Sequence, residues 1–84
     1  MFEIEYVKNI NRDLDQIDKR QLGKIKKAIE TLKNFPDVSN IKKLSAHPLA
    51  DYRMRVGEYR VLFDVYWEKK TIYVLKIGHR KDVY

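Results

Sequence analysis

The chain has 84 residues, of which 44% are hydrophobic and 36% are charged, and this composition excludes a disordered segment and predicts one soluble domain over residues 1–84. It has no cysteine, which excludes disulfides, thiolate catalysis and cysteine-based zinc sites. It shows neither a signal-peptide pattern nor an apolar run long enough to span a membrane, so a cytoplasmic location is expected. The net charge of +6 suits either a solubilising surface or an anionic partner such as nucleic acid, and the charge alone leaves both open.

A strand and a short helix are predicted at the N-terminal end. Apolar residues at positions 2, 4 and 6 alternate with two glutamates, which is typical of a half-buried strand over residues 2–8. The asparagines within residues 9–11 can cap a short helix that follows, and Leu14 and Ile17 are its expected buried residues.

A second, longer helix is predicted to begin at Asp18, because Gln21 stands three residues on in the pattern of a capping box. Apolar residues then recur every three or four positions as far as Leu32, which indicates one buried face. The helix is expected to end near Asn34, since Pro36 disfavours helical geometry at the residue before it. The opposite face is basic and consists of Lys19, Arg20, Lys24, Lys26, Lys27 and Lys33. It is either a solvated helix face or a contact surface for nucleic acid or an acidic protein.

Residues 37–50 are predicted to connect this helix to a set of strands, since Pro48 argues against a central strand there. From residue 52 the apolar period changes to two, and three strands are expected over residues 52–56, 59–67 and 71–77. Short turns join them, so they must pair antiparallel. The predicted fold is α+β, in the order β-α-α-β-β-β, with a mostly antiparallel sheet and two N-terminal helices packed on one face.

Gly57 and Glu58 form a two-residue turn signal, which sets the register of the hairpin around them. The apolar and aromatic residues of the two strands then share the core face, and the other face carries Arg53, Arg55 and Arg60. Arg55 lies directly opposite Arg60 in this register.

Like charges at opposed positions destabilise a strand pair by up to about 1 kcal/mol. One interpretation of the Arg55–Arg60 pair is a solvent-exposed face on which Asp64 relieves the repulsion. The other is that an anion, most simply a phosphate, supplies the missing charge, because the planar guanidinium gives paired hydrogen bonds to phosphate oxygens. The distribution of arginine favours this second interpretation: lysines outnumber arginines 12 to 6, yet four of the six arginines lie at or after position 53.

Aromatic and histidine side chains near these arginines are further candidates. Tyr66, Trp67 or the C-terminal Tyr84 could stack on an RNA base, although Trp67 could equally cover a sheet edge. His79, which follows a strand end, could accept a proton near pH 7 or could cap that strand end. His47 precedes a proline and is expected to be an ordinary loop residue.

Two motifs occur together in the last 33 residues: YRMRVGEYRVLF, which begins at Tyr52, and IYVLKIGHRKDVY, which ends at Tyr84. With the pair Lys43-Leu44 before the hairpin, they resemble the RelE family of bacterial and archaeal toxins, within the RelE/ParE superfamily of toxin–antitoxin systems. The resemblance covers the whole chain in layout and is most specific in these two motifs.

The resemblance implies a ribosome-dependent endoribonuclease that cuts mRNA in the ribosomal A site without a metal or cofactor. In that chemistry the 2′-hydroxyl attacks the adjacent phosphate. Arg60 and Arg80 would hold the phosphate, and Tyr84 would position the 2′-hydroxyl or stack on a base. The family pattern has lysines where this chain has Arg53 and Arg55, so these two would act electrostatically, and proton transfer would fall to His79 or Tyr84.

Three kinds of partner are implied as well: a cognate antitoxin that covers the basic surface, mRNA in the A site, and ribosomal RNA, with no membrane. An alternative within the same superfamily is a ParE-like toxin that inhibits DNA gyrase by protein–protein contact and needs no catalytic residues. A non-catalytic RNA-binding relative is a third.

Overall fold

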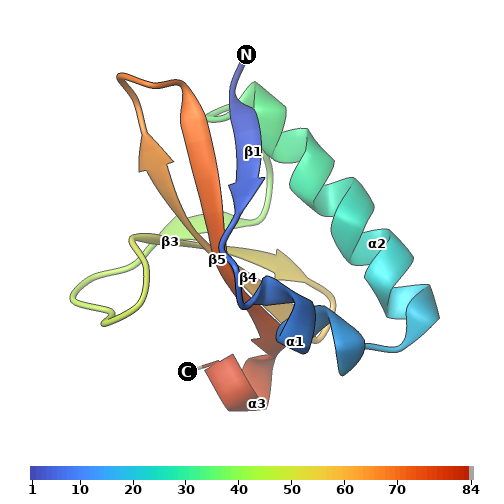
Figure 1. The fold of residues 1–84 in the computed structure, drawn as a ribbon. Coiled ribbons are helices and arrows are strands. Elements are labelled where there is room, and N and C mark those ends of the chain that lie inside the picture. The colour runs from blue at the N-terminus through green and yellow to red at the C-terminus, as the bar shows by residue number, and fades with distance from the viewer. Residues whose placement is uncertain (84) are drawn as a thin grey trace.

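The structure is a computed structural model that describes residues 1–83, and the predicted role of Tyr84 lies outside the described residues. Figure 1 shows a twisted sheet with helices α1 and α2 on one side and a third short helix, α3, at the C-terminal end. In chain order the elements are β1 (Glu3–Tyr6), α1 (Ile10–Asp15), α2 (Lys19–Glu30), the 3-10 helix η1 (Thr31–Asn34), β2 (Ile41–Lys43), β3 (Tyr52–Val56), β4 (Tyr59–Tyr66), β5 (Thr71–His79) and α3 (Arg80–Val83). None of the helices in the described residues is long and apolar enough to cross a bilayer.

The predicted α+β class and the mostly antiparallel sheet are confirmed. The strands lie in the order β1-β5-β4-β3-β2, and every neighbouring pair is antiparallel except β1 and β5. The crossover from β1 to the hairpins contains α1 and α2, which places the N-terminal strand beside the last one (Figure 1). β1 covers only residues 71–74 of β5, so the C-terminal part of β5 is paired with β4 on one side, while Asp13 of α1 accepts the Ile77 amide on the other side.

A strand that the sequence did not predict forms the other edge of the sheet. Residues 37–50 were expected to be only a connection, but β2 pairs with β3 and places Ile41 opposite Met54 and Lys42 opposite Arg53. Pro48 lies outside this strand, so the proline excludes a strand only at the residues next to it. Three residues are too short a run to show a period of two, which is why the pattern gave no signal.

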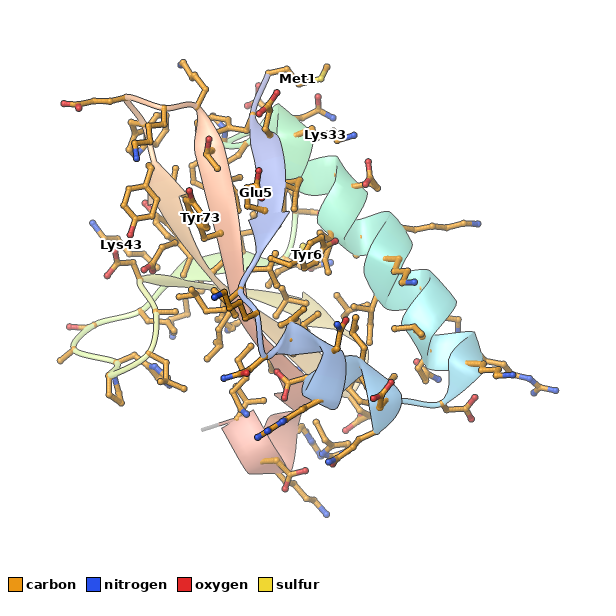
Figure 2. The ribbon with its side chains drawn as sticks, viewed as in Figure 1. Met1, Glu5, Tyr6, Lys33, Lys43 and Tyr73 are labelled. Carbon is orange, nitrogen blue, oxygen red and sulfur yellow. The ribbon has the colours of Figure 1, made fainter. Side chains whose placement is uncertain are left out.

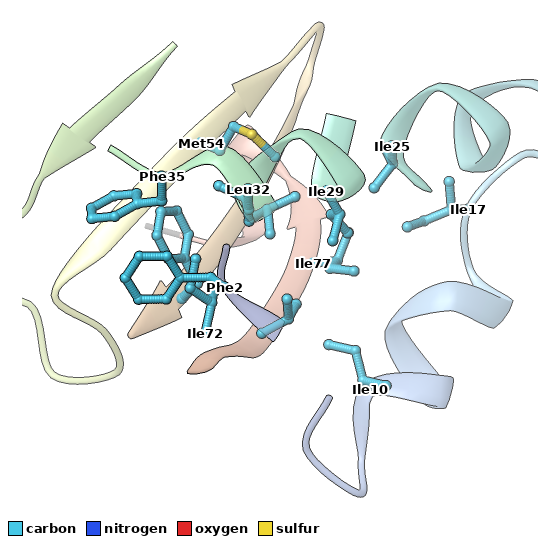
Figure 3. Close-up of a cluster of buried hydrophobic side chains, with 13 residues drawn as sticks. Phe2, Ile10, Ile17, Ile25, Ile29, Leu32, Phe35, Met54, Ile72 and Ile77 are labelled. Atoms are coloured by element: carbon cyan, nitrogen blue, oxygen red, sulfur yellow. The ribbon is translucent and has the colours of Figure 1, made fainter. Parts of the chain in front are cut away.

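The core between the sheet and α1 and α2 is built by the predicted apolar stripe. Ile25, Ile29 and Leu32 have at most 1% of their surface exposed, and they pack on Val61 and Phe63 of β4. Figure 3 shows the isoleucines of the two helices facing the strands. Further members of this cluster are Phe2, Ile10, Ile17, Phe35, Met54, Ile72, Val74 and Ile77.

The ends of the second helix follow the local signals. Asp18 caps it as predicted, although its carboxylate accepts a hydrogen bond from the Arg20 amide at 3.0 Å, one residue earlier than a capping box requires. The α-helical part ends at Glu30, and the 3-10 helix η1 continues the chain to the predicted end at Asn34.

The third helix covers the opposite face of the sheet, where no helix was expected. Val83 of α3 packs with Leu62 and Ala50 in a second, smaller hydrophobic cluster. Helix α3 packs closely on β5 at Gly78, where an added Cβ atom would lie only 2.8 Å from Cγ2 of Val83. The helices therefore do not all cover one face, and α3 lies on the face that carries the arginines.

Candidate functional site

The hairpin of β3 and β4 has the register that the sequence predicted. Val56 pairs with Tyr59, Arg55 with Arg60 and Arg53 with Leu62. Gly57 has a φ of +59°, a conformation that glycine adopts without strain at the first position of a hairpin turn. The turn thus aligns two arginines side by side on the face that α3 partly covers.

Arg60 is not the exposed cation that the alternation of the strand suggested. Only 7% of its surface is exposed, and its Nη1 donates hydrogen bonds of 2.9 Å to the carbonyl oxygens of both Gly57 and Tyr59. These carbonyls partly balance the charge, so the opposition of Arg55 and Arg60 does not by itself require a bound anion. Arg60 stabilises the turn through these two hydrogen bonds, whereas Arg55, its partner on β3, is exposed.

A second row of cations runs across the same face, one step further from the turn. Lys42 of β2 pairs with Arg53, Arg53 pairs with Leu62, and Leu62 pairs with Lys76 of β5. The sequence could not place Lys42 and Lys76 here, because the first depends on the unexpected strand β2 and the second on a register shift between β4 and β5 next to Leu62. Lys76 is partly neutralised by Asp13 of α1, whose carboxylate lies 3.7 Å from its Nζ.

The opposite end of this sheet face is acidic and aromatic. Glu5 of β1 pairs with Tyr73 of β5, and Tyr73 pairs with Asp64 of β4. Figure 2 shows Glu5 and Tyr73 beside each other, well away from α3. On this face the arginines and Lys76 therefore lie toward the end near α3, and an anion bound there would be kept apart from the carboxylates of Glu5 and Asp64.

Arg80 comes to the turn from the other strand. Its backbone N–H donates to the carbonyl oxygen of Glu58 at 2.8 Å, and its Nε lies 2.9 Å from Oε2 of the same glutamate. The side chain of Arg80 keeps 53% of its surface exposed. The turn thus joins Arg60 through Gly57 and Arg80 through Glu58, and Glu58 is a member of the site that was predicted only as a turn residue.

His79 lies on the other face of the sheet from Arg60. Arg60 pairs with Gly78, and the next residue of β5 points to the opposite face. It pairs with Tyr59, and the two rings meet edge to face with centroids 5.7 Å apart. Its Nδ1 accepts a hydrogen bond of 3.2 Å from the Lys81 amide, and its Nε2 lies 4.0 Å from the carboxylate of Glu58. In the neutral ring Nδ1 is therefore the acceptor and Nε2 carries the proton. His79 can take up a proton only by giving up this hydrogen bond, so the structure favours a capping role.

The aromatic residues predicted to stand beside the arginines lie at the far end of β4. Tyr66 is six residues from Arg60 along the strand, which at about 3.3 Å per residue separates them by roughly 20 Å. Trp67 packs against Phe2 and Phe35, with ring centroids 5.4 Å away in both cases, and half of its surface is exposed. Trp67 therefore covers the end of the core, which agrees better with the alternative that it covers the edge of the sheet than with stacking on an RNA base.

His47 lies outside the hairpin that carries the arginines. His47 lies in the loop between β2 and β3, where its Nδ1 accepts a hydrogen bond from the Leu49 amide, in agreement with its expected role as a loop residue. Among the side chains of residues 1–83, no three histidine, aspartate or glutamate residues form a group that could hold a metal ion.

Known proteins are similar to this chain both in sequence and in architecture. The family model of the ParE toxin of the type II toxin–antitoxin system parDE matches residues 4–84. The chain belongs to the RelE/ParE family of type II toxins. The RelE1 protein of Methanocaldococcus jannaschii is 35% identical to this toxin over 86 aligned positions, which cover 99% of the chain and 94% of that protein.

Two crystal structures of related complexes support the same assignment. The RelE–RelB complex of Pyrococcus horikoshii contains a chain that is 26% identical to this toxin, with a TM-score of 0.75 and coverage of 96% of this chain and 97% of the other. The RelB–RelE complex of Methanococcus jannaschii gives 29% identity, a TM-score of 0.74 and coverage of 95% and 94%. The predicted membership of the RelE-type toxins is confirmed.

Proposed function

We propose that this toxin is a metal-independent endoribonuclease that cuts mRNA in the ribosomal A site and so stops translation. The observation that carries the proposal is the convergence of Arg55, Arg60 and Arg80 on one hairpin turn, at the basic end of a sheet face. Arginine forks suit the oxygens of a phosphate, and their fixed positive charge stabilises the extra negative charge of a phosphorane.

The reaction is a transfer of phosphate within the RNA strand. The 2′-hydroxyl loses its proton as its oxygen bonds to the adjacent phosphorus, the bond from phosphorus to the 5′-oxygen breaks, and that oxygen takes up a proton. The products are a 2′,3′-cyclic phosphate and a free 5′-hydroxyl. Arg53 and Arg55 supply charge, Arg80 holds the phosphate and Tyr84 positions the 2′-hydroxyl, while the buried Arg60 fixes the turn that aligns them. Tyr84 is the proposed proton acceptor, because Nδ1 of His79 is occupied by the Lys81 amide.

A cognate antitoxin is the proposed partner, since the two related RelE chains were crystallised with RelB. An acidic or amphipathic segment of the antitoxin would cover the basic end of the sheet and would exclude RNA from it. The basic face of α2 would meet either this antitoxin or ribosomal RNA. A ribosomal target also fits the expected cytoplasmic location.

The proposal is tested by adding the purified toxin to ribosomes that hold a defined mRNA, and by following cleavage in the A site. We expect Arg80→Ala to lower the cleavage rate by about 100-fold, because removing one donor from a site that stabilises developing charge has costs of this order. Arg12→Ala is the matched control, since it removes the same side chain from an exposed position of α1 that is outside the proposed site and outside the basic face of α2. Equal rates for the two variants would contradict the proposed site.

A second candidate function is supported by the family model that matches, which carries the description of the ParE toxin. In this alternative the toxin inhibits DNA gyrase by protein–protein contact, and the arginines form part of a docking surface. Supercoiling by gyrase should then fall when the toxin is added, while mRNA on ribosomes stays intact. The nuclease proposal predicts the reverse of both results.

A further inference from the structure

Glu58 is an acidic residue in direct contact with Arg80, and its position is unusual for a site that binds an anion. It is the second residue of the turn between β3 and β4, and 61% of its side chain is exposed. An acidic side chain there weakens the positive field in which a phosphate would bind. A residue that served only the turn would not need a carboxylate, because the second position of a turn that begins with glycine accepts many residue types.

The contacts of Glu58 show what the carboxylate does. Oε2 lies 2.9 Å from Nε of Arg80, and the carbonyl oxygen of the same residue accepts the Arg80 amide at 2.8 Å. Arg80 is thus fixed both at its backbone and at the root of its guanidinium group. A flexible arginine that is otherwise exposed at the end of a strand would sample many rotamers, and ordering it on binding would be costly.

The contact at Nε also determines which edge of the guanidinium remains for a ligand. The group has five N–H donors in a rigid plane, one of them on Nε and four on the two Nη nitrogens. Because Glu58 takes Nε, the edge formed by the two Nη nitrogens is the one that remains to bind two oxygens of a phosphate. The orientation of that edge is then set by the turn and not by the flexible stem of the arginine.

We infer that Glu58 is a positioning residue, which holds the guanidinium of Arg80 with its Nη edge directed at the scissile phosphate. This role rests on the nuclease function proposed above and adds a specific residue to it. A positioned donor accelerates the reaction more than it increases affinity, since its geometry matches the phosphorane while its charge is partly balanced by the carboxylate.

The test measures single-turnover cleavage of mRNA on ribosomes over a range of toxin concentrations, so that the maximal rate and the half-saturating concentration are separated. We expect Glu58→Ala to lower the maximal rate about tenfold, while the half-saturating concentration stays equal or falls because one negative charge is lost. Glu58→Gln keeps an oxygen that can accept from Nε and should recover part of the rate. The matched control is Glu68→Ala, which removes the same charge from the turn between β4 and β5, at the opposite end of β4.

A double mutant separates positioning from any other role. If Glu58 acts through Arg80, the Glu58→Ala change should have no further effect on the rate once Arg80→Ala is present. A tenfold loss that persists in the Arg80→Ala background would overturn the inference, because Glu58 would then act on the substrate directly or through His79, whose Nε2 lies 4.0 Å from its carboxylate. A maximal rate that rises in Glu58→Ala would overturn it as well, since the carboxylate would then be shielding Arg80.

A measurement without RNA keeps this inference separate from the proposed function. The ¹⁵N relaxation of Nε in Arg80 reports the mobility of the guanidinium group in the free toxin. We expect an ordered Nε in the wild type and in Glu68→Ala, and a mobile one in Glu58→Ala. If the wild type cuts no mRNA but its Nε is ordered by Glu58, the nuclease proposal fails while the positioning of Arg80 stands. A mobile Nε in the wild type would refute the positioning itself.

Discussion

Replacement of Gly78 by alanine should displace α3 and destabilise the toxin. The new Cβ would lie 2.8 Å from Cγ2 of Val83, whereas carbon atoms in contact are normally about 3.5–4.0 Å apart. A shift of roughly 0.7–1.2 Å is therefore required. Valine cannot relieve the clash by turning away, since β-branching restricts its χ1 angle, so the helix or the strand must move.

The magnitude follows from the cost of overpacking, which is about 1–3 kcal/mol of the free energy of unfolding. In a domain of this size each kcal/mol corresponds to about 4–8 °C in the melting temperature, so we expect Gly78→Ala to melt roughly 5–20 °C below the wild type. Circular dichroism during heating and urea titration measures both quantities. Cleavage on ribosomes should fall too, because Arg80 begins the displaced helix.

Two further variants make this prediction specific. Gly23→Ala is the control, since an added Cβ in the middle of α2 meets nothing within 4 Å and should stabilise the helix by about 0.5–1 kcal/mol. In the double mutant Gly78→Ala/Val83→Ala the clash is absent. The double mutant should therefore lose less free energy of unfolding than the two single mutants together, by about 1 kcal/mol or more. A Gly78→Ala variant as stable as the wild type, or strict additivity with Val83→Ala, would refute the reasoning.

Three smaller predictions concern the polar contacts around the site. Arg60→Ala should lower the free energy of unfolding by about 1–3 kcal/mol in urea titration, because it leaves the carbonyls of Gly57 and Tyr59 without a charged donor, whereas Arg55→Ala should change it by less than about 0.5 kcal/mol. Asp13→Ala should cost about 1–2 kcal/mol in the same titration, since its carboxylate accepts the Ile77 amide at 3.0 Å, and an unchanged value would show that water replaces it without loss. Asp18→Ala should cost about 0.5–2 kcal/mol through loss of the cap on α2, visible as a lower urea midpoint, and no change would mean that the cap is redundant.

The hairpin that carries the arginines could be derived from the sequence because its determinants are local. A two-residue turn at Gly57 fixes every pairing on both sides of it, so the opposition of Arg55 and Arg60 follows from counting. The apolar stripe of α2 is local in the same sense, since one helix face repeats over 12 residues.

The features that were not predicted all depend on contacts distant in the sequence. The edge strand β2 is three residues long and is defined only by its pairing with β3. The short helix α3 is placed by the small cluster of Val83, Leu62 and Ala50, which come from three separate segments. Neither feature has a periodicity of its own.

The burial of Arg60 shows the limit of alternation as a guide to exposure. The residue is on the face that the pattern predicts, yet its guanidinium turns back to the carbonyls of the turn and is covered. The Glu58–Arg80 contact likewise requires the end of β5 to reach the turn of the neighbouring hairpin. Sequence reasoning could find the charged residues of the site, but it could not say which cations are balanced within the protein.

If the arginines at the turn promote attack of the 2′-hydroxyl on the adjacent phosphate, the chemistry of the fragment ends must show it. Ribosomes that hold an mRNA labelled on both sides of the A site would be treated with the wild-type toxin, and the termini of both fragments would be identified. We expect a 2′,3′-cyclic phosphate on one fragment and a 5′-hydroxyl on the other, both strongly reduced with Arg80→Ala. Intact mRNA, or fragments that end in a 3′-hydroxyl and a 5′-phosphate, would contradict it.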